Sequence, residues 1–158
     1  MKINSIDIFA NTNPAFCSVI LYNFCKGYFA VKEKPIPFPL IILPLPIILS
    51  GDLQKTFEST NIKTGFLSWV KNNPNLLIGL TKRLEDTYEI TRPALEYGIS
   101  RKILALNDDG ELLPTNNLIK NPNNNLIENY FKFSARLGGW TGEVQSVKTI
   151  FNHLGIRL

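Results

Sequence analysis

The sequence contains few of the residues that enzymes most often use for acid–base, nucleophilic or metal chemistry. Among its 158 residues there is one histidine, His153, and there are two cysteines, Cys17 and Cys25. Zinc sites built from cysteine and histidine need closely spaced pairs, and these three residues have no such spacing. Both cysteines fall in one predicted buried helix, where thiols are usually inert, so a Cys–His nucleophile is the weaker alternative. We therefore predict a protein that is not an enzyme and that holds neither a metal nor a cofactor.

Motifs that bind phosphate groups are missing from the sequence as well. Its glycine cluster, Gly138–Gly142 (GGWTG), has neither the lysine nor the strand-to-helix context of a P-loop, and it does not match the dinucleotide-binding pattern. We interpret this cluster as an element that either breaks a helix or packs closely against a neighbour. The adjacent carboxylates Glu85–Asp86 and Asp108–Asp109 are interpreted as a solvated helix face and a turn.

No apolar run has the length of a transmembrane helix, which needs about 20 residues. The main apolar stretch, Pro35–Ser50 (PIPFPLIILPLPIILS), carries half of the chain's 10 prolines. Proline breaks helix interiors and pushes the residue before it toward extended geometry. We therefore predict an extended, strand-like segment threaded through the core, and no membrane contact. Because Asp7 interrupts the N-terminal apolar residues, we expect no secretion signal, a cytoplasmic location and reduced cysteines.

Length and composition indicate one domain. Hydrophobic residues make up 44% of the chain and charged residues 19%, which is typical of a folded globular protein. The net charge of +4 comes from lysines and arginines that are spread along the chain, so it does not by itself indicate nucleic-acid binding. The fold class that we predict is α+β, a mostly helical single domain over residues 1–158.

Local signals place the N-terminal elements. Residues 1–12 alternate weakly and are expected to form a short strand or an arm. Asn13-Pro14 combines a helix N-cap with a proline suited to the first helical position. The helix that follows is apolar nearly all round, which indicates burial, and Gly27 is its expected end.

The segment from about residue 74 to 114 has the outline of a winged helix. A first helix has leucines at spacings of three and four, and its polar face includes Arg83. A second helix is expected to begin at Thr91, as its N-cap, with Pro93 in its first turn. The turn Asn107–Gly110 (NDDG) between two short apolar runs then indicates a β-hairpin.

A winged helix is often a DNA-binding module, and the cations that would face DNA here are Arg92, Arg101 and Lys102. The acidic residues Asp108 and Asp109 at the tip of the hairpin would repel phosphate groups. The alternative is a winged-helix scaffold used only for packing or for contact with protein.

The C-terminal region, from about residue 122 to 158, is predicted to be helical. Asn121-Pro122 is the expected start of its first helix, and Gly138-Gly139 is expected to weaken that helix near its end. The last helix is predicted to be capped by Ser146 and to end at Gly155.

Three stretches together resemble one known family. They are NPAFCSVILYNFCKGY with the following PIPFPLIILPLPIILS, then TRPALEYG with its hairpin, and finally ARLGGWTGEVQSVKTIFNHLGIRL. This combination is similar to the small middle component of bacterial three-component ABC ATPase systems, the group that includes the Lamassu defence complexes. The resemblance runs from about Asn13 to the C-terminus.

The resemblance implies a non-enzymatic subunit that works beside an SMC- or RecN-like ABC ATPase and an effector, often a nuclease. It also implies that the chain couples nucleic-acid sensing by the ATPase to effector activation against phages or plasmids, and that it meets DNA only through the complex. The positions typical of the family are Asn13, Pro14, Pro39, Thr91, Arg92, Arg136, Leu137, Gly138, Trp140, Ile150, Phe151 and Gly155.

Most of these positions already have a structural role as caps, turns or core residues. Arg136 and Trp140 are the exceptions, and an arginine and a large aromatic beside glycines are candidate contacts with a partner. The alternative is a core tryptophan and a surface arginine. The leading hypothesis is therefore an adaptor subunit of an ABC ATPase defence complex. The alternative hypothesis is a stand-alone winged-helix DNA-binding regulator.

Overall fold

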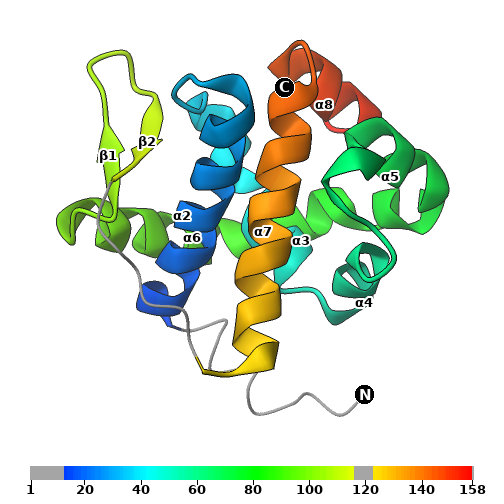
Figure 1. The fold of residues 1–158 in the computed structure, drawn as a ribbon, viewed down its shortest axis with the longest axis horizontal. Coiled ribbons are helices and arrows are strands. Elements are labelled where there is room, and N and C mark those ends of the chain that lie inside the picture. Colours follow the sequence, from blue (N-terminus) through cyan, green and yellow to red (C-terminus); the bar gives the residue numbers. More distant parts are fainter. Residues whose placement is uncertain (1–12, 116–122, 158) are drawn as a thin grey trace.

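The computed structural model describes residues 13–115 and 123–157, which fold into helices and a two-stranded sheet (Figure 1). The strand or arm predicted for residues 1–12 lies outside these ranges, and so does the helix start predicted at Asn121-Pro122. Over the described part of the chain the mostly helical fold predicted from the sequence is confirmed.

Two long helices, α2 (Pro14–Lys32) and α7 (Asn125–Glu143), run side by side and in the same direction through the middle of the molecule (Figure 1). The start of α2 is as predicted, because the side chain of Asn13 accepts hydrogen bonds from the first free backbone N–H groups of the helix. Its end is not, since α2 continues through Gly27 to Lys32. Gly27 faces α7, so its role is close packing.

The two helices keep a constant register. In one row of contacts, each α2 residue faces the α7 residue 114 positions later in the chain. The facing pairs are Phe16 with Tyr130, Ile20 with Ser134, Phe24 with Gly138 and Tyr28 with Gly142. A spacing of four on both helices is the ridge spacing of the commonest helix–helix packing. The predicted weakening of the last helical region at Gly138-Gly139 is wrong, because α7 passes through both glycines unbroken.

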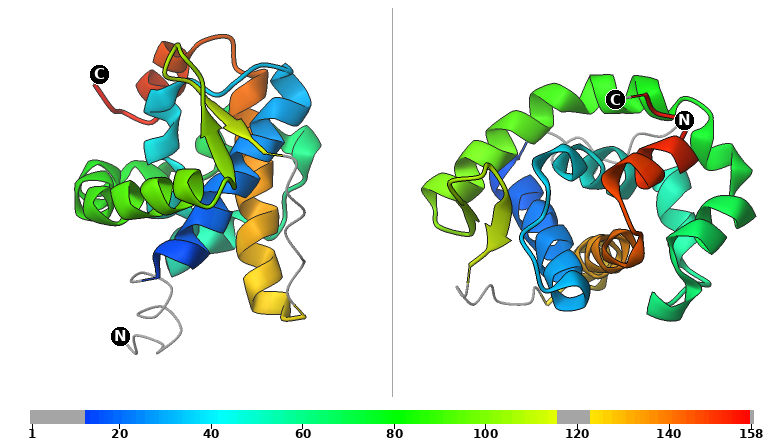
Figure 2. Two further views of the ribbon diagram at one scale, coloured as in Figure 1. Left: turned by 90° about the vertical axis from the view of Figure 1, so that its left-hand side faces the viewer. Right: turned by 90° about the horizontal axis from the view of Figure 1, so that it is seen from above.

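The proline-rich stretch Pro35–Ser50 lies in the core as predicted, but it is not extended. It forms a 3₁₀ turn, Phe38–Ile42, and a short helix, α3 (Pro44–Ile48). Its one isolated sheet-like pairing joins Ile36 to Leu112. Each short helix has a proline in its first two positions, where the missing N–H costs no hydrogen bond. The prolines therefore divide the stretch into helical turns, and α3 packs among α2, α6 and α7 (Figure 2).

Helix α6 (Leu80–Ser100) crosses the α2/α7 pair and is continuous (Figures 1 and 2). The predicted helix-turn-helix is therefore wrong. Thr91 is not a cap, because its hydroxyl donates to the carbonyl of Thr87 within the same helix (3.0 Å). Pro93 lies inside the helix. The cost of an internal proline is offset by packing, since the same helix buries Ala94 and brings Gly98 against α2.

The hairpin at the end of the winged-helix-like segment is confirmed. Strands β1 (Leu104–Leu106) and β2 (Leu112–Pro114) pair antiparallel, with Ala105 opposite Leu113. The side chain of Asn107 accepts hydrogen bonds from backbone N–H groups in the turn, and Gly110 takes the positive φ (76°) that a tight turn needs. Residues 74–114 thus contain the predicted wing, and the single continuous helix α6 replaces the two predicted helices.

Short helical elements complete the structure. They are α4 (Gly51–Gln54), the 3₁₀ turns Lys55–Phe57, Ile62–Thr64 and Pro74–Leu77, α5 (Phe66–Asn72) and α8 (Val147–His153). Ser146 caps α8 by accepting from the N–H of Thr149, and Gly155 adopts a positive φ (70°) after its end, both as predicted. The start of α7 is capped by Asn124, whose side chain accepts from the N–H of Leu126.

Within the described ranges, no single helix combines the length and the apolar composition needed to cross a membrane. One pair of segments, Phe38–Ile48 and Gly51–Phe57, reaches that composition only when it is joined across a bend of 94°.

Candidate partner-binding site

Trp140, a predicted candidate for partner contact, lies in the core and not on the surface. Its side chain is fully buried and stacks on Phe57, with the ring centroids 5.5 Å apart, and its ring lies 5.4 Å from that of Trp69. The indole N–H donates to the backbone carbonyls of Asn61 and Ile62. The structure therefore shows the core alternative for Trp140, in which it fastens α7 to the 3₁₀ turn Ile62–Thr64.

Arg136 is half-buried beside the same cluster. Its Nη1 donates to the carbonyl of Phe57 (3.0 Å) and to the hydroxyl of Thr60 (3.1 Å), and its guanidinium lies over the ring of Phe133. Burial lowers the pKa of this guanidinium. The side chain thus connects α7 to the end of the preceding 3₁₀ turn. Contact of Arg136 with a partner stays a prediction.

The three predicted DNA-facing cations do not form one patch. Arg92 is exposed on α6 and pairs with Glu96 at 3.1 Å, while Arg101, just after the helix, lies over the ring of Tyr97. Nine helical positions separate the two arginines by about 13 Å along the axis and half a turn around it. Lys102 is exposed in a left-handed backbone conformation before β1. Nothing in this arrangement concentrates positive charge on one helix face.

The thiols and the histidine are in surroundings that do not suit nucleophilic catalysis. Burial raises the pKa of Cys17 to about 11 and that of Cys25 to about 12, so both are protonated at neutral pH. His153 is exposed in the last turn of α8. In the described ranges, no group of three or more His, Cys, Asp or Glu side chains is arranged to hold a metal ion.

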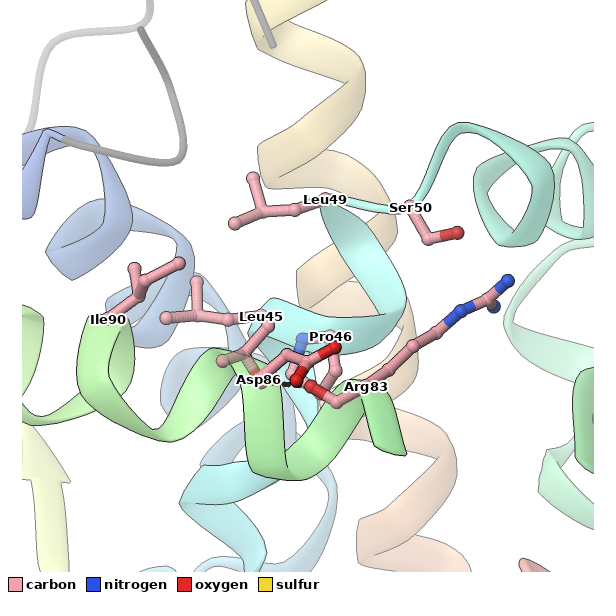
Figure 3. A pocket seen from close by; sticks show the side chains of 8 residues that line it. Leu45, Pro46, Leu49, Ser50, Arg83, Asp86 and Ile90 are labelled. Carbon is pink, nitrogen blue, oxygen red and sulfur yellow. Dashed lines mark hydrogen bonds between the residues drawn. The ribbon is translucent and has the colours of Figure 1, made fainter. Parts of the chain in front are cut away.

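A pocket of about 250 Å³ lies between α3 and the first half of α6 (Figure 3). The α6 residues that line it follow the helical spacing of three and four, which places them on the face turned toward α3. The lining residues are Leu45, Pro46, Leu49, Ser50, Arg83, Asp86, Thr87 and Ile90. The walls are therefore mainly apolar, with charged side chains from α6 at the edge.

A second pocket, of about 460 Å³, also borders Arg83. It is lined by Asp52, Leu53, Thr56, Asn72, Asn73, Pro74, Asn75, Leu76, Ile78 and Arg83. Arg83 is thus the residue that the two pockets share. We refer to the two pockets, which share Arg83, together as the Arg83 groove.

The guanidinium of Arg83 extends from α6 toward the connection between α3 and α4 (Figure 3). Its Nη1 is buried, and no residue in the described ranges makes a hydrogen bond to it. A guanidinium presents a planar set of N–H donors that matches the oxygens of a carboxylate or a phosphate. The Arg83 groove can therefore bind an anionic group beside apolar side chains.

Sequence reasoning placed Arg83 on the polar face of a helix and missed this site. A signal was present, because Arg83, Thr87, Ile90 and Ala94 are spaced by four, three and four residues. That spacing puts an arginine on the inward face of α6. Which residues it faces depends on the position of α3 and α4, and no local pattern gives that position.

Comparison with known families gives one match, to the model of the ABC-three component (ABC-3C) system Middle Component 3, and it covers residues 5–158. Neither the curated proteins nor the solved structures contain a match to the chain. The family match includes all the elements described above and agrees with the resemblance noted in the sequence. The chain belongs to the Middle Component 3 family of ABC-three component systems.

Proposed function

We propose that this chain is a non-catalytic adaptor that links the ATPase of its ABC-three component system to an effector subunit. The observation that carries the proposal is the family match over residues 5–158, because a component of a multi-subunit system has partner subunits. The ATPase in this proposal is of the SMC or RecN type, the effector is a nuclease or another toxic activity, and the complex acts against phages or plasmids.

The roles of the polar and reactive side chains support an adaptor over an enzyme. Cys17 and Cys25 are buried and protonated, and Trp140 and Arg136 hold α7 to neighbouring turns. A large apolar side chain of the Arg83 groove, that of Ile78, is nevertheless 71% exposed. Exposed apolar surface of this kind is typical of subunits that bind other proteins.

The decisive experiment is co-expression of the three subunits of one system with a tag on the effector. The adaptor proposal predicts that the ATPase is recovered with the effector only when this chain is present, and that the three elute together at a fixed ratio in size-exclusion chromatography with light scattering. A matched control omits this chain. Recovery of the ATPase with the effector in that control, or a chain that elutes apart from both, contradicts the proposal.

A plaque assay tests the defence role separately. The complete system is expected to reduce plaque formation, and deletion of this chain is expected to restore it to the level of cells that lack the system. Equal protection without the chain would show that the chain is not required for defence.

Contact with DNA is proposed to occur through the complex. The isolated chain is expected to show no salt-sensitive binding to duplex DNA, whereas the ATPase complex binds it with the steep salt dependence of phosphate contacts. Salt-sensitive binding by the isolated chain that falls on neutralisation of Arg92, Arg101 and Lys102 would instead favour a DNA-binding regulator.

A further inference from the structure

We propose that the Arg83 groove binds one carboxylate side chain, an aspartate or a glutamate, carried on an apolar segment of a partner subunit. The proposal deepens the adaptor function and rests on it for the identity of the partner, but the chemistry of the groove can be tested without any partner.

The Arg83 guanidinium has an unused hydrogen-bond donor among the described residues. Its Nη1 is buried and has no hydrogen-bond partner in residues 13–115 or 123–157. A buried charged donor without a partner is costly, and a carboxylate supplies both the opposite charge and the acceptor oxygens. The backbone of Arg83 is held by the packing of α6 on α2 and α3, and its side chain lines both pockets.

Among the described residues, the carboxylates that line the two pockets form no ion pair with Arg83. Asp86 lines the same pocket but is 63% exposed, and its Oδ2 pairs with Nζ of Lys82 at 3.4 Å. Asp52 lines the second pocket, and the ion pairs of the described residues include none between it and Arg83. Both carboxylates lie at the edges of the groove, so the buried Nη1 has no acceptor among the described residues and can take one from a partner subunit.

The residues that line the groove indicate which class of ligand it can bind. Leu45, Leu49 and Ile90 line the pocket on one side of Arg83, which suits apolar side chains next to the anion. Asp52 and Asp86 flank the groove and repel any anion, so a ligand with one negative charge is opposed less than a nucleic acid with many. A short protein segment with a single carboxylate fits both features.

The groove is tested first with peptides. The probe is a tetrapeptide, Leu-Glu-Leu-Leu, acetylated and amidated so that its only charge is the glutamate side chain. Its matched control is Leu-Gln-Leu-Leu. Titration into the full chain is followed by NMR of the methyl groups of Leu45, Leu49 and Ile90. We expect the glutamate peptide to shift these methyl signals with a Kd at least about 10-fold lower than that of the glutamine peptide, as for loss of a charge-assisted hydrogen bond.

Variants of the chain identify the residue responsible. Arg83→Gln is expected to weaken binding of the glutamate peptide by about 10- to 100-fold, and Arg83→Lys, which keeps the charge but loses the planar donors, by less. Arg92→Gln is the matched control, because it removes an exposed arginine from the same helix outside the groove. It is expected to leave peptide affinity unchanged. Methyl spectra of each variant check that it remains folded.

Two results would overturn the proposal. One is that neither peptide, at millimolar concentration, shifts the three methyl signals, or that both shift them equally. The other is that Arg83→Gln, folded by its spectrum, binds the glutamate peptide as the unaltered chain does.

The co-expressed complex then separates this proposal from the adaptor function. If the unaltered chain binds the ATPase or the effector, Arg83→Gln should reduce recovery of one of them by at least about 10-fold while Arg92→Gln does not. Partner binding that ignores Arg83→Gln overturns the groove proposal and leaves the adaptor function standing. Peptide binding without any bound subunit supports the groove and counts against the adaptor function.

Discussion

Two helix–helix contacts of the molecule, α2 with α7 and α3 with α6, differ in how closely the chain approaches itself. Between α2 and α7 the backbones meet, so that a Cβ added at Gly27 would lie 1.9 Å from the carbonyl oxygen of Ala135, and one added at Gly138 would lie 2.0 Å from that of Phe24. The contact between α3 and α6 leaves a pocket of about 250 Å³. One contact has no spare volume, and the other has room for a further side chain.

This difference distinguishes the part of the molecule that holds the fold together from the part that can bind another group. A backbone-to-backbone contact fixes the distance between two helices and leaves no side chain that can rearrange. A contact with unfilled volume, beside an Arg83 whose Nη1 is buried and has no hydrogen-bond partner among the described residues, can accept a new group without moving a helix. We infer that α2 and α7 hold the fold while the α3/α6 side provides the site.

The largest expected effect comes from Gly138→Ala, which breaks the tight contact. The new Cβ would overlap the backbone of α2, so the helices must separate or a backbone must shift. We expect a loss of more than about 4 kcal/mol in the free energy of unfolding, beyond ordinary overpacking, which would leave many domains largely unfolded. Chemical denaturation followed by circular dichroism measures it.

Gly51→Ala is the matched control for this change. No atom lies within 4 Å of a Cβ built at Gly51, and the residue is helical in α4. Alanine has the better helix propensity, so the variant should be as stable as the unaltered chain or more stable by up to about 1 kcal/mol. Equal stabilities for Gly138→Ala and Gly51→Ala would show that α2 and α7 do not meet through their backbones.

The next largest effect is a loss of stability at high pH, which is caused by the two thiols of α2. Because burial raises the pKa of Cys17 to about 11 and that of Cys25 to about 12, the folded state favours the protonated thiols. Their contribution to stability is complete below the unfolded pKa, near 9, and is lost as pH rises through the folded values. Because of the two thiols, the free energy of unfolding should be about 2 to 3 kcal/mol lower at pH 10 than at pH 8.

Other groups titrate in the same range, so the control is a double variant, Cys17→Ala with Cys25→Ala. Subtracting its pH profile from that of the unaltered chain isolates the thiols. Parallel profiles between pH 8 and pH 10 would mean that the thiols are accessible to solvent, contrary to the tight packing of α2. Slow reaction of the native chain with a thiol reagent is the expected companion result.

A smaller loss is expected for Trp140→Phe, at the far end of α7. The substitution keeps an aromatic ring against Phe57 but removes the indole N–H that donates to two backbone carbonyls, and it leaves a void. We expect a loss of about 2 kcal/mol in the free energy of unfolding, from one buried hydrogen-bond donor and a few carbon atoms. Thermal or chemical unfolding measures it. Unaltered stability would place Trp140 at the surface, as a contact for a partner.

The features predicted correctly from the sequence were those with local causes. Asn13, Ser146 and Gly155 act at helix ends through their own side chains or backbone, and the turn Asn107–Gly110 contains its own hydrogen bonds. Such signals lie within a few residues of one another, so they can be identified without the rest of the fold.

The wrong predictions concern features that distant parts of the chain decide. Proline and Thr91 favour a helix boundary near Pro93, yet packing on α2 keeps α6 whole. The glycines of α7 look like helix breakers until Phe24 and Gly27 are seen opposite them. Arg83 became a candidate only once α3 and α4 had been placed beside it.

The smallest expected effect is that of Thr87→Ile, which fills the loose contact. Thr87 lines the pocket between Leu45, Leu49 and Ile90, and its hydroxyl bonds only to carbonyls of its own helix, among them that of Arg83 (2.8 Å). Isoleucine adds volume where there is room, so stability should rise by about 0.5 kcal/mol. Chemical denaturation, in parallel with Gly138→Ala, measures it.

Comparison of Gly138→Ala with Thr87→Ile tests whether the two contacts differ in how much added volume they tolerate. A few added atoms should be strongly destabilising between α2 and α7 and nearly neutral between α3 and α6. If Thr87→Ile instead costs the 1–3 kcal/mol that is usual for about one extra group in a filled core, the pocket is closed in solution. If it is neutral and also weakens binding of the glutamate peptide, the added methyl groups occupy the space that the apolar part of the ligand needs, and the volume beside Arg83 belongs to the binding site.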